Sequence, residues 1–468
     1  MAAIKPADDY MSDSLGANSR RAIVSRNSLA LILLGVASLI IYRIALRAEG
    51  TTGIVWFLKL VAVQAGLYVI AVWLILRARF AKSDLVVAVV FGVLFRLSIL
   101  FSPPYLSDDI YRYVWDGRVQ AAGVNPYRYI PADSSLAHLR DKQIYPKINR
   151  REYARTMYPP VAEIVYLLTT RVSESVTWMK ATMLLFEGVA VWAMLQLLAS
   201  FGLPRRRILI YAWHPLVVWE FAGSGHLDAI AIAFITLALL ARRKNVESLT
   251  GIALACATLV KLFPVALFPA LYKRRQWRMP LAFSLAVLIA YAPYLRVGPL
   301  GVLGFLPGYA SERGMVSGEH FFILGAARKL LAGSNIPTSA FIIFACLVLV
   351  ALAVWIWRKE EPEGGSYVTK GLIMATVFSI LLAPHFPWYL SWLVPFLCLR
   401  PWAPIFYLTL GSFLLYLTWI YYSPDQVLIL KAFLYVPFLM LGSIAIWWRH
   451  RKLPHRPQTA LVGQFEDA

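Results

Sequence analysis

Residues 102–129 read SPPYLSDDIYRYVWDGRVQAAGVNPYRY and open a long polar segment in a chain otherwise built from apolar runs. The Pro103-Pro104 pair ends the apolar run before it, because proline lacks a backbone donor and restricts the residue that precedes it. Ser107 is then expected to cap a new helix. Its first turn carries Asp108 and Asp109, where the helix dipole favours negative charge.

The same stretch has a polar face and an end signal. Helical periodicity places Asp109, Arg112 and Asp116 on one face and Trp115 on the neighbouring one. Gly123 suits a C-terminal cap, since glycine adopts the left-handed conformation that ends many helices. On these features alone, an amphipathic helix lying at a membrane interface is an alternative to a functional site.

Composition predicts an all-α, polytopic integral membrane protein. The chain has 468 residues, of which 59% are hydrophobic and 15% charged, with a mean hydropathy of +0.63. The formal charge of +21 does not indicate a nucleic-acid partner, because the basic residues cluster in short loops between apolar runs, as in the positive-inside pattern. Cys256, Cys346 and Cys398 all lie within apolar runs, so neither a disulfide framework nor a zinc site is expected.

Loop charge predicts the topology. We expect a cytoplasmic tail at 1–27, a transmembrane domain at 28–448 and a second cytoplasmic tail at 449–468. The first apolar run is expected to be retained as a membrane helix rather than cleaved as a signal peptide. Residues 102–158 then form a large first extracytoplasmic loop. The segment 249–272 has basic flanks on both sides, which favours a broken hairpin that turns at Lys261-Leu262-Phe263-Pro264. About 12–14 membrane passes follow from this reading.

Ionisable residues gather at the face that this topology places outside. They are Asp108, Asp109, Asp116, Glu220, His226, Asp228, Lys261, Arg313, His320 and His385. Charged groups beside membrane helices are costly, so their convergence indicates a functional site. An enzyme on the outer face needs an activated group delivered by a lipid, typically a sugar on polyprenyl phosphate. The chemistry needs a carboxylate to accept a proton, cations for the phosphate and aromatic rings for the sugar.

Several motifs carry a family resemblance. After the acidic pair come WDGRVQAAGVNPY, Tyr158-Pro159-Pro160, WHPLVVWEFAGSGHLDA, LVKLFP and HFPWYLSW. In this order they resemble the GT-C superfamily of polytopic membrane glycosyltransferases. They are most similar to bacterial polyprenol-phosphate-mannose-dependent α-mannosyltransferases and glycosyltransferase family 87, and more distantly to the enzyme that adds the first mannose of GPI anchors. The resemblance covers roughly residues 28–450 and implies a GT-C-type helical bundle.

The resemblance also implies an activity. It indicates inverting transfer of a hexose, with mannose favoured, from a polyprenyl-phosphate donor to a lipid or glycan acceptor. The membrane is then the bacterial cytoplasmic membrane, and the active site faces the exterior. By position in the motif, Asp108 matches the catalytic base and Asp109 the second acidic residue. The spacing is Asp-Asp rather than Asp-x-Asp, which leaves open both the choice between them and the need for Mg or Mn.

The candidate substrate-binding residues have structural alternatives. The candidates are Arg112, Trp115, Asp116, Tyr158, His226, Asp228, Lys261 and His385. His226 and Asp228 stand at a helix start, where they can simply cap free backbone amides. Lys261 can instead pair with Asp228 or Glu220, and His385 can satisfy backbone carbonyls. Arg96, deep in an apolar run, is a candidate partner for the acidic loop.

Two other functions remain as alternatives. One is a transporter or flippase of lipid-linked sugars, in which the carboxylates couple protons. The absence of internal repeats and the position of the acidic pair in a loop disfavour it. The other is a polymerase or ligase of surface polysaccharide, which uses the same kind of lipid donor. In all three cases the partners are membrane lipids and lipid-linked sugars rather than nucleic acid.

Overall fold

The computed structural model describes residues 26–47, 50–77, 82–331, 335–359 and 365–452. This part of the chain is helical and contains no strand. Seven of its helical segments are long and apolar enough to cross a membrane: α1 (Arg26–Ala45), α2 (Gly50–Arg77), α3 (Lys82–Leu100), α6 (Val176–Ser200), α12 (Arg278–Tyr291) with its continuation η6 (Ala292–Val297), α15 (Thr338–Arg358) and α19 (Pro424–Lys452). The predicted all-α, multi-pass membrane protein is confirmed.

Shorter helices complete the bundle. They are α5 (Pro160–Thr170), η3 (Arg205–Ile208), α7 (Leu209–Ala212), α8 (Pro215–Val218), η4 (Trp219–Gly223), α9 (Asp228–Arg243), α10 (Glu247–Thr258), η5 (Phe263–Leu267), α11 (Phe268–Leu271), α16 (Ser366–Leu382), η8 (Pro387–Leu393), α17 (Val394–Leu399), α18 (Ala403–Gly411) and η9 (Ser412–Trp419). Many of these helices are too short to cross a membrane on their own, so the number of membrane passes stays a prediction.

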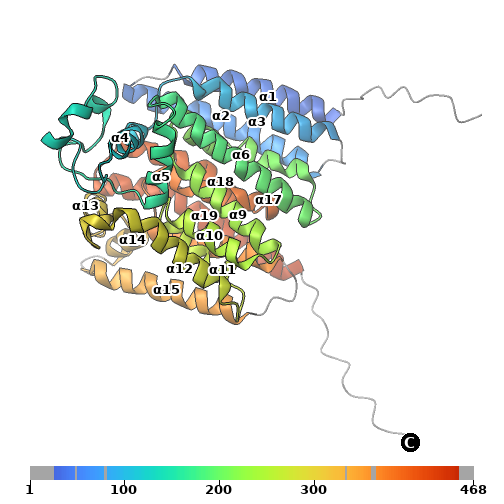
Figure 1. Cartoon of the computed structure of the whole chain (residues 1–468). Coiled ribbons are helices and arrows are strands. Elements are labelled where there is room, and N and C mark those ends of the chain that lie inside the picture. Colours follow the sequence, from blue (N-terminus) through green and yellow to red (C-terminus); the bar gives the residue numbers. More distant parts are fainter. Residues whose placement is uncertain (1–25, 48–49, 78–81, 332–334, 360–364, 453–468) are drawn as a thin grey trace, which may run out of the picture.

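The bundle has a polar cap at one end. The cap contains α4 (Asp109–Ala121), η1 (Ser134–Leu139), η2 (Tyr145–Lys147), η7 (Gly301–Leu303), α13 (Leu306–Glu312) and α14 (Phe322–Leu330). In Figure 1, α4, α13 and α14 lie together at one end of the molecule, and α11 and α17 lie at the other. Residues 102–158, which contain α4, η1 and η2, connect α3 to α5, and α4 packs against α5 and α6.

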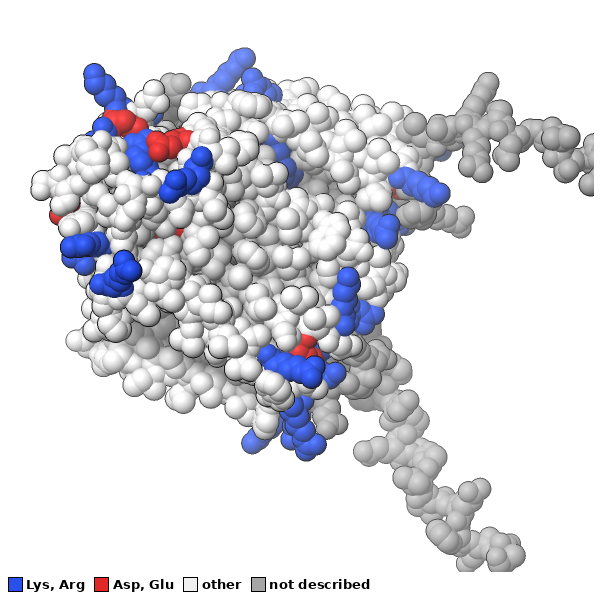
Figure 2. All heavy atoms as spheres, in the orientation of Figure 1, with Lys and Arg blue, Asp and Glu red and all other residues white. Residues whose placement is uncertain are grey.

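The buried core centres on α9. Apart from Phe234, Leu237 and Arg243, all of its residues are buried, and it packs against both α6 and α10. The outer helices expose large apolar side chains instead, such as Leu288 of α12 and Leu347 of α15, which are 65% and 63% exposed. Figure 2 shows the same division: Lys and Arg gather toward the two ends of the bundle, and the surface between them is mostly uncharged. An apolar belt of this kind suits a surface that faces lipid.

Helix breaks follow the prolines. The predicted broken hairpin is present, since α10 ends at Thr258 and η5 begins at Phe263. Residues 205–223 are likewise divided into the short helices η3, α7, α8 and η4. Pro215 cannot donate the helical hydrogen bond, so the chain breaks there, and the His214 ring accepts a hydrogen bond from the backbone of Leu216 at 3.2 Å.

One pairing prediction needs correction, while the limits of the two tails stay predictions. Helix α1 begins at Arg26 and α19 continues to Lys452, and residues 1–25 and 453–468 lie outside the described part. Arg96 does not pair with the acidic loop. Its guanidinium instead makes two hydrogen bonds to the Glu187 carboxylate and donates to the Ala212 carbonyl oxygen at 2.7 Å. A buried arginine needs a partner at its own depth, and α6 supplies it.

Candidate functional site

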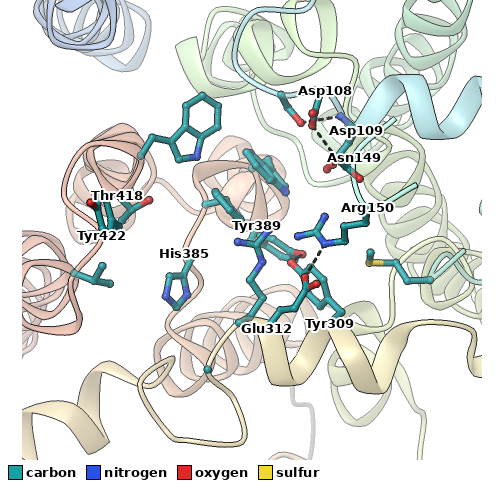
Figure 3. Close-up of a pocket in the computed structure, with 18 of the residues that line it drawn as sticks. Asp108, Asp109, Asn149, Arg150, Tyr309, Glu312, His385, Tyr389, Thr418 and Tyr422 are labelled. Atoms are coloured by element: carbon teal, nitrogen blue, oxygen red, sulfur yellow. Dashed lines mark hydrogen bonds and ion pairs between the residues drawn. The ribbon is translucent and has the colours of Figure 1, made fainter. Parts of the chain in front are cut away.

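A cavity of about 870 Å³ opens between the cap and the bundle. Its walls come from the start of α4, from residues 149–158, from α13 with the turn after it, from residues 385–389 and from the η9–α19 junction. These segments are far apart in the sequence. Figure 3 shows Asp108, Asp109 and Asn149 on one side of the cavity, with His385, Thr418 and Tyr422 across from them.

The acidic pair stands where α4 begins. Asp108 is the N-cap residue and is exposed to the cavity, while Asp109 is the first helical residue and is partly buried. The Asn149 side-chain amide donates to both carboxylates, at 2.9 Å to Oδ1 of Asp108 and 2.8 Å to Oδ1 of Asp109 (Figure 3). Ser107 accepts a hydrogen bond from the Asp109 backbone at 3.2 Å, but the N-cap residue is Asp108, so the predicted cap lies one residue too early. One amide thus fixes two neighbouring carboxylates.

Burial raises the pKa of Asp109 above its ordinary value. The nearby charge of Asp108 acts in the same direction, while the hydrogen bond from Asn149 and the charges of Lys261 and Arg150 act against it. A general base works best when its pKa approaches the operating pH. Asp109 therefore has the kind of buried, charge-rich setting in which acid–base groups are often found.

The wall beside the pair is a polar network. Arg150 donates to Glu312 at 2.6 Å, and the Tyr153 hydroxyl donates to the same carboxylate at 2.8 Å. Burial raises the pKa of Glu312, but these two hydrogen bonds outweigh it, so the pKa lies below its ordinary value. The hydroxyls of Tyr309 and Tyr389 lie 2.9 Å apart. This network ties α13 to the loop that holds Asn149.

The floor of the cavity carries a buried ion pair. Nζ of Lys261 lies 2.6 Å from Oδ2 of Asp228 and 4.4 Å from the centre of the Tyr389 ring. Beneath this floor, the His226 ring stacks on Trp388 with centroids 4.0 Å apart, and its Nε2 lies 3.5 Å from Glu220. Asp228 and His226 are each 1% exposed, so Lys261 is the member of this group that meets the cavity.

The structure divides the predicted site residues in two. Five line the cavity: Asp108, Asp109, Tyr158, Lys261 and His385. Five do not: Arg112, Trp115, Asp116, His226 and Asp228.

Of the five that do not line the cavity, Arg112, Trp115 and Asp116 are buried within the cap, and His226 and Asp228 lie beneath the cavity floor. Nε of Arg112 lies 2.8 Å from Asp116, the i,i+4 pair that the helical face predicts, and its Nη1 donates to the Ala154 carbonyl. Trp115 is 1% exposed and packs 5.5 Å from the Tyr145 ring. Through these contacts Arg112, Trp115 and Asp116 hold the cap together, and none of the three lines the cavity.

Most of the cavity lining was not among the candidates, including the polar residues Asn149, Arg150, Tyr309, Glu312 and Tyr389. Asn149 and Arg150 stand in a polar part of the loop with no motif, and no sequence signal singles them out. Tyr389 belongs to HFPWYLSW, and its position next to Pro387-Trp388 was the available signal.

Metal binding has limited support from the side chains present. Among the described residues, no group of three or more His, Cys, Asp and Glu is arranged to hold a metal ion. Asp108 and Asp109 supply two adjacent carboxylates, which hard cations such as Mg²⁺ accept. Both carboxylates are bonded to the Asn149 amide, and that amide would have to release them for a metal to bind between them.

Two comparisons with known proteins both match this chain to mannosyltransferases. Residues 24–273 match the family described as alpha-(1->6)-mannopyranosyltransferase, N-terminal domain. This span includes the acidic pair, Asn149, Asp228 and Lys261. The chain is also similar to alpha-(1->6)-mannopyranosyltransferase A of Mycobacterium tuberculosis (strain ATCC 25618 / H37Rv), at 25% identity over 330 residues. The alignment covers 64% of this chain and 62% of the relative, so the chain spans less than two thirds of that protein's length.

Proposed function

The chain belongs to the alpha-(1->6)-mannopyranosyltransferase family, and from this premise we propose that it transfers a mannosyl residue to a hydroxyl of a lipid or glycan acceptor. The observation that carries the proposal is the acidic pair at the cavity. Asp108 and Asp109 are fixed by one amide in a space large enough for a sugar and an acceptor, within the part of the chain that the family covers.

The acidic pair supplies the general base. An acceptor hydroxyl is a weak nucleophile, and removal of its proton during attack on the sugar lowers the barrier. Asp108 is open to the cavity and matches the base by its place in the motif. Asp109 lies beside it, and its raised pKa reflects burial and the neighbouring charge. Single displacement by the activated hydroxyl inverts the anomeric configuration, because the nucleophile attacks opposite the leaving group.

We propose a polyprenyl-phosphate sugar as the donor. A phosphodiester gains negative charge as the sugar departs, so a cation at the cavity stabilises the transition state more than the ground state. Lys261 and His385 are the predicted phosphate contacts that meet the cavity. Lys261 brings the positive charge, whereas the His385 ring, whose pKa burial lowers to about 2, can offer a hydrogen bond but no charge. The third, His226, lies beneath the floor, and its proposed part is to support Trp388, on which it stacks.

The proposed location is the outer side of a bacterial cytoplasmic membrane. The support comes from charge: the basic runs at Arg205–Arg207 and Arg242–Lys244 lie at helix ends, and short loops of this kind face the cytoplasm. Crossing α1, α2 and α3 from a cytoplasmic start brings residues 102–158 to the outside. The cavity is then reached from the exterior and from the membrane, where lipid-linked donors reside.

The decisive assay compares two donors. Purified protein in lipid nanodiscs receives either mannosyl-phosphoryl-polyprenol or a nucleotide-linked mannose, and transfer to extracted acceptors is followed by mass spectrometry. We expect transfer from the lipid donor alone, with an α-linkage seen by NMR where the donor is β-linked. Transfer from the nucleotide sugar, with the lipid donor inert, sinks the proposal. Movement of intact donor across the bilayer without transfer would favour a flippase instead.

A further inference from the structure

A second pocket joins the cavity on its membrane side. It has a volume of about 280 Å³ and shares eight lining residues with the large cavity, among them Lys261, Arg313, His385 and Tyr389. Apart from His320, the residues that line this pocket alone are apolar, such as Leu306, Phe378 and Leu382. A polar chamber therefore opens directly into an apolar one, and a charged side chain stands where the two meet.

Arg313 is the cation at this junction without an acidic partner. Among the described residues, its guanidinium makes neither an ion pair nor a hydrogen bond, and its Nε is buried with no acceptor. Its face packs on Phe386, with the guanidinium carbon 4.6 Å from the ring centre, and on Tyr309 at 5.3 Å. Stacking fixes the plane of the guanidinium and leaves its donors free in that plane.

The other cations of the region are already engaged. Lys261 is paired with Asp228 at 2.6 Å, and Arg150 with Glu312 at 2.6 Å. Lys431 donates to the carbonyl oxygens of His320 and Ala383 at 2.5 and 2.6 Å.

His385 is close to the junction but carries no charge. Burial, followed by the charge of Lys431, lowers its pKa to about 2, so the ring is neutral at physiological pH. Among the described residues, Arg313 is the one basic side chain lining both pockets that makes neither an ion pair nor a hydrogen bond. An unsatisfied buried donor is costly, which indicates that an anionic partner completes the site.

We propose that Arg313 holds the phosphate of a polyprenyl-phosphate sugar at the junction of the two pockets. The isoprenyl units next to the phosphate then enter the apolar pocket, and the sugar lies in the polar cavity that Asp108 and Asp109 line. This placement rests on the proposed function. It follows from the chemistry of such a donor, in which a singly charged phosphate joins an apolar isoprenyl chain to a polar sugar.

The test uses two ligands that differ only in the phosphate. Farnesyl phosphate and farnesol are titrated against the full-length protein in nanodiscs, and their dissociation constants are compared. Wild type should bind farnesyl phosphate roughly 10- to 100-fold more tightly than farnesol, the range of a charge-assisted contact. Arg313→Met should lose most of this preference, and Arg313→Lys should keep a larger part of it because it keeps the charge without the planar fork.

Two further variants separate the parts of the site. Arg128→Met removes an exposed arginine of the outer loop that packs on Tyr129 and should leave the preference intact. Ala310→Phe fills the apolar pocket and should weaken both ligands together. If Arg313→Met keeps the wild-type preference while wild type transfers mannose from the lipid donor, the assignment of Arg313 is overturned and the proposed function stands. If wild type shows neither the preference nor transfer from the lipid donor, the proposed function itself falls.

Discussion

The ammonium of Lys261 lies 2.6 Å from a carboxylate oxygen of Asp228, and it does so at the floor of the cavity rather than within the core. The lysine is partly open to the cavity, whereas the aspartate is 1% exposed. The pair joins the start of α9 to the break after α10. The structural partnership that the sequence leaves open is therefore present, and a contact between Lys261 and the donor phosphate stays a prediction.

A double-variant comparison separates these roles. Lys261→Met leaves the buried Asp228 carboxylate without its partner and should lower the free energy of unfolding by about 3–5 kcal/mol. Adding Asp228→Asn removes the stranded charge and should recover most of that loss, measured by thermal unfolding in detergent. If the lysine contacts phosphate, the rate of transfer stays low in the stable double variant. A rate that recovers together with stability would show a structural role alone.

Neutral variants of the acidic pair test the base. Asp108→Asn keeps shape and hydrogen bonding but cannot accept a proton, so turnover should fall by roughly 10²–10⁴. Thermal stability should change little, because Asp108 is exposed at a helix start. Glu152→Gln changes an exposed carboxylate of the same loop and should leave turnover near wild type. If Asp108→Asn keeps near-normal turnover and Asp109→Asn loses it, the base is Asp109. Normal turnover in both variants would count against the proposed enzymatic mechanism.

Local patterns in the sequence predicted local structure well. The Pro103-Pro104 pair ends α3, Gly123 ends the loop helix with a φ of +78°, and Arg112 pairs with Asp116 one turn away. Each of these follows from backbone chemistry or helical spacing between near neighbours. The multi-pass helical bundle followed in the same way from the length and hydropathy of the apolar runs.

The site depends on contacts that no local pattern encodes. Asn149 reaches Asp109 across 40 residues, and Arg96 meets Glu187 across 91, so both pairings are decided by how the helices pack. The sequence also could not show which polar residues meet the cavity. Lys261 and Asp228 belong to equally polar motifs, yet packing leaves the lysine accessible and encloses the aspartate.

The pH profile should report the acidic pair. Transfer needs an unprotonated carboxylate at the acidic pair. Where Asp109 is that base, its raised pKa places the loss of activity on acidification at a higher pH than for an ordinary aspartate. Asn149→Ala removes a hydrogen bond that lowers this pKa, so the acid limb of log kcat/KM against pH should move further up. The matched variant Asn125→Ala, in a turn outside the cavity, should leave the limb unmoved. A limb that stays in place, or shifts to lower pH, in Asn149→Ala would contradict the assignment.

The orientation in the membrane can be measured directly. A periplasm-active reporter fused after Gly123, in the cap, should be active. After Lys244, in the loop between α9 and α10, a reporter that works only in the cytoplasm should be active, and the periplasm-active reporter should be silent. The two positions lie on opposite sides if the basic loops face the cytoplasm. A cytoplasmic signal at Gly123 would place the acidic pair on the inner side and remove the argument for a lipid-linked donor.

The close packing of the loop helix against α5 should be essential to the position of the acidic pair. A Cβ added at Gly117 would lie 2.5 Å from the Tyr166 carbonyl oxygen and 2.6 Å from the Thr170 side chain, so α4 would have to move away from α5. Gly117→Ala should therefore lower the free energy of unfolding by about 1–3 kcal/mol, measured by thermal unfolding. Because Asp109 begins the same helix, transfer should fall as well.

The control for this variant is Gly188→Ala, on an exposed position of α6 where an added Cβ meets no atom within 4 Å. Alanine favours a helix over glycine by roughly 1 kcal/mol, so this variant should be as stable as wild type or more so. Both variants replace glycine by alanine within a helix. Comparing them therefore separates the effect of the close contact between α4 and α5 from the effect of helix propensity. If Gly117→Ala keeps full stability and full transfer, α4 is not positioned by its contact with α5. The acidic pair must then be held in place by Asn149 and the loop alone.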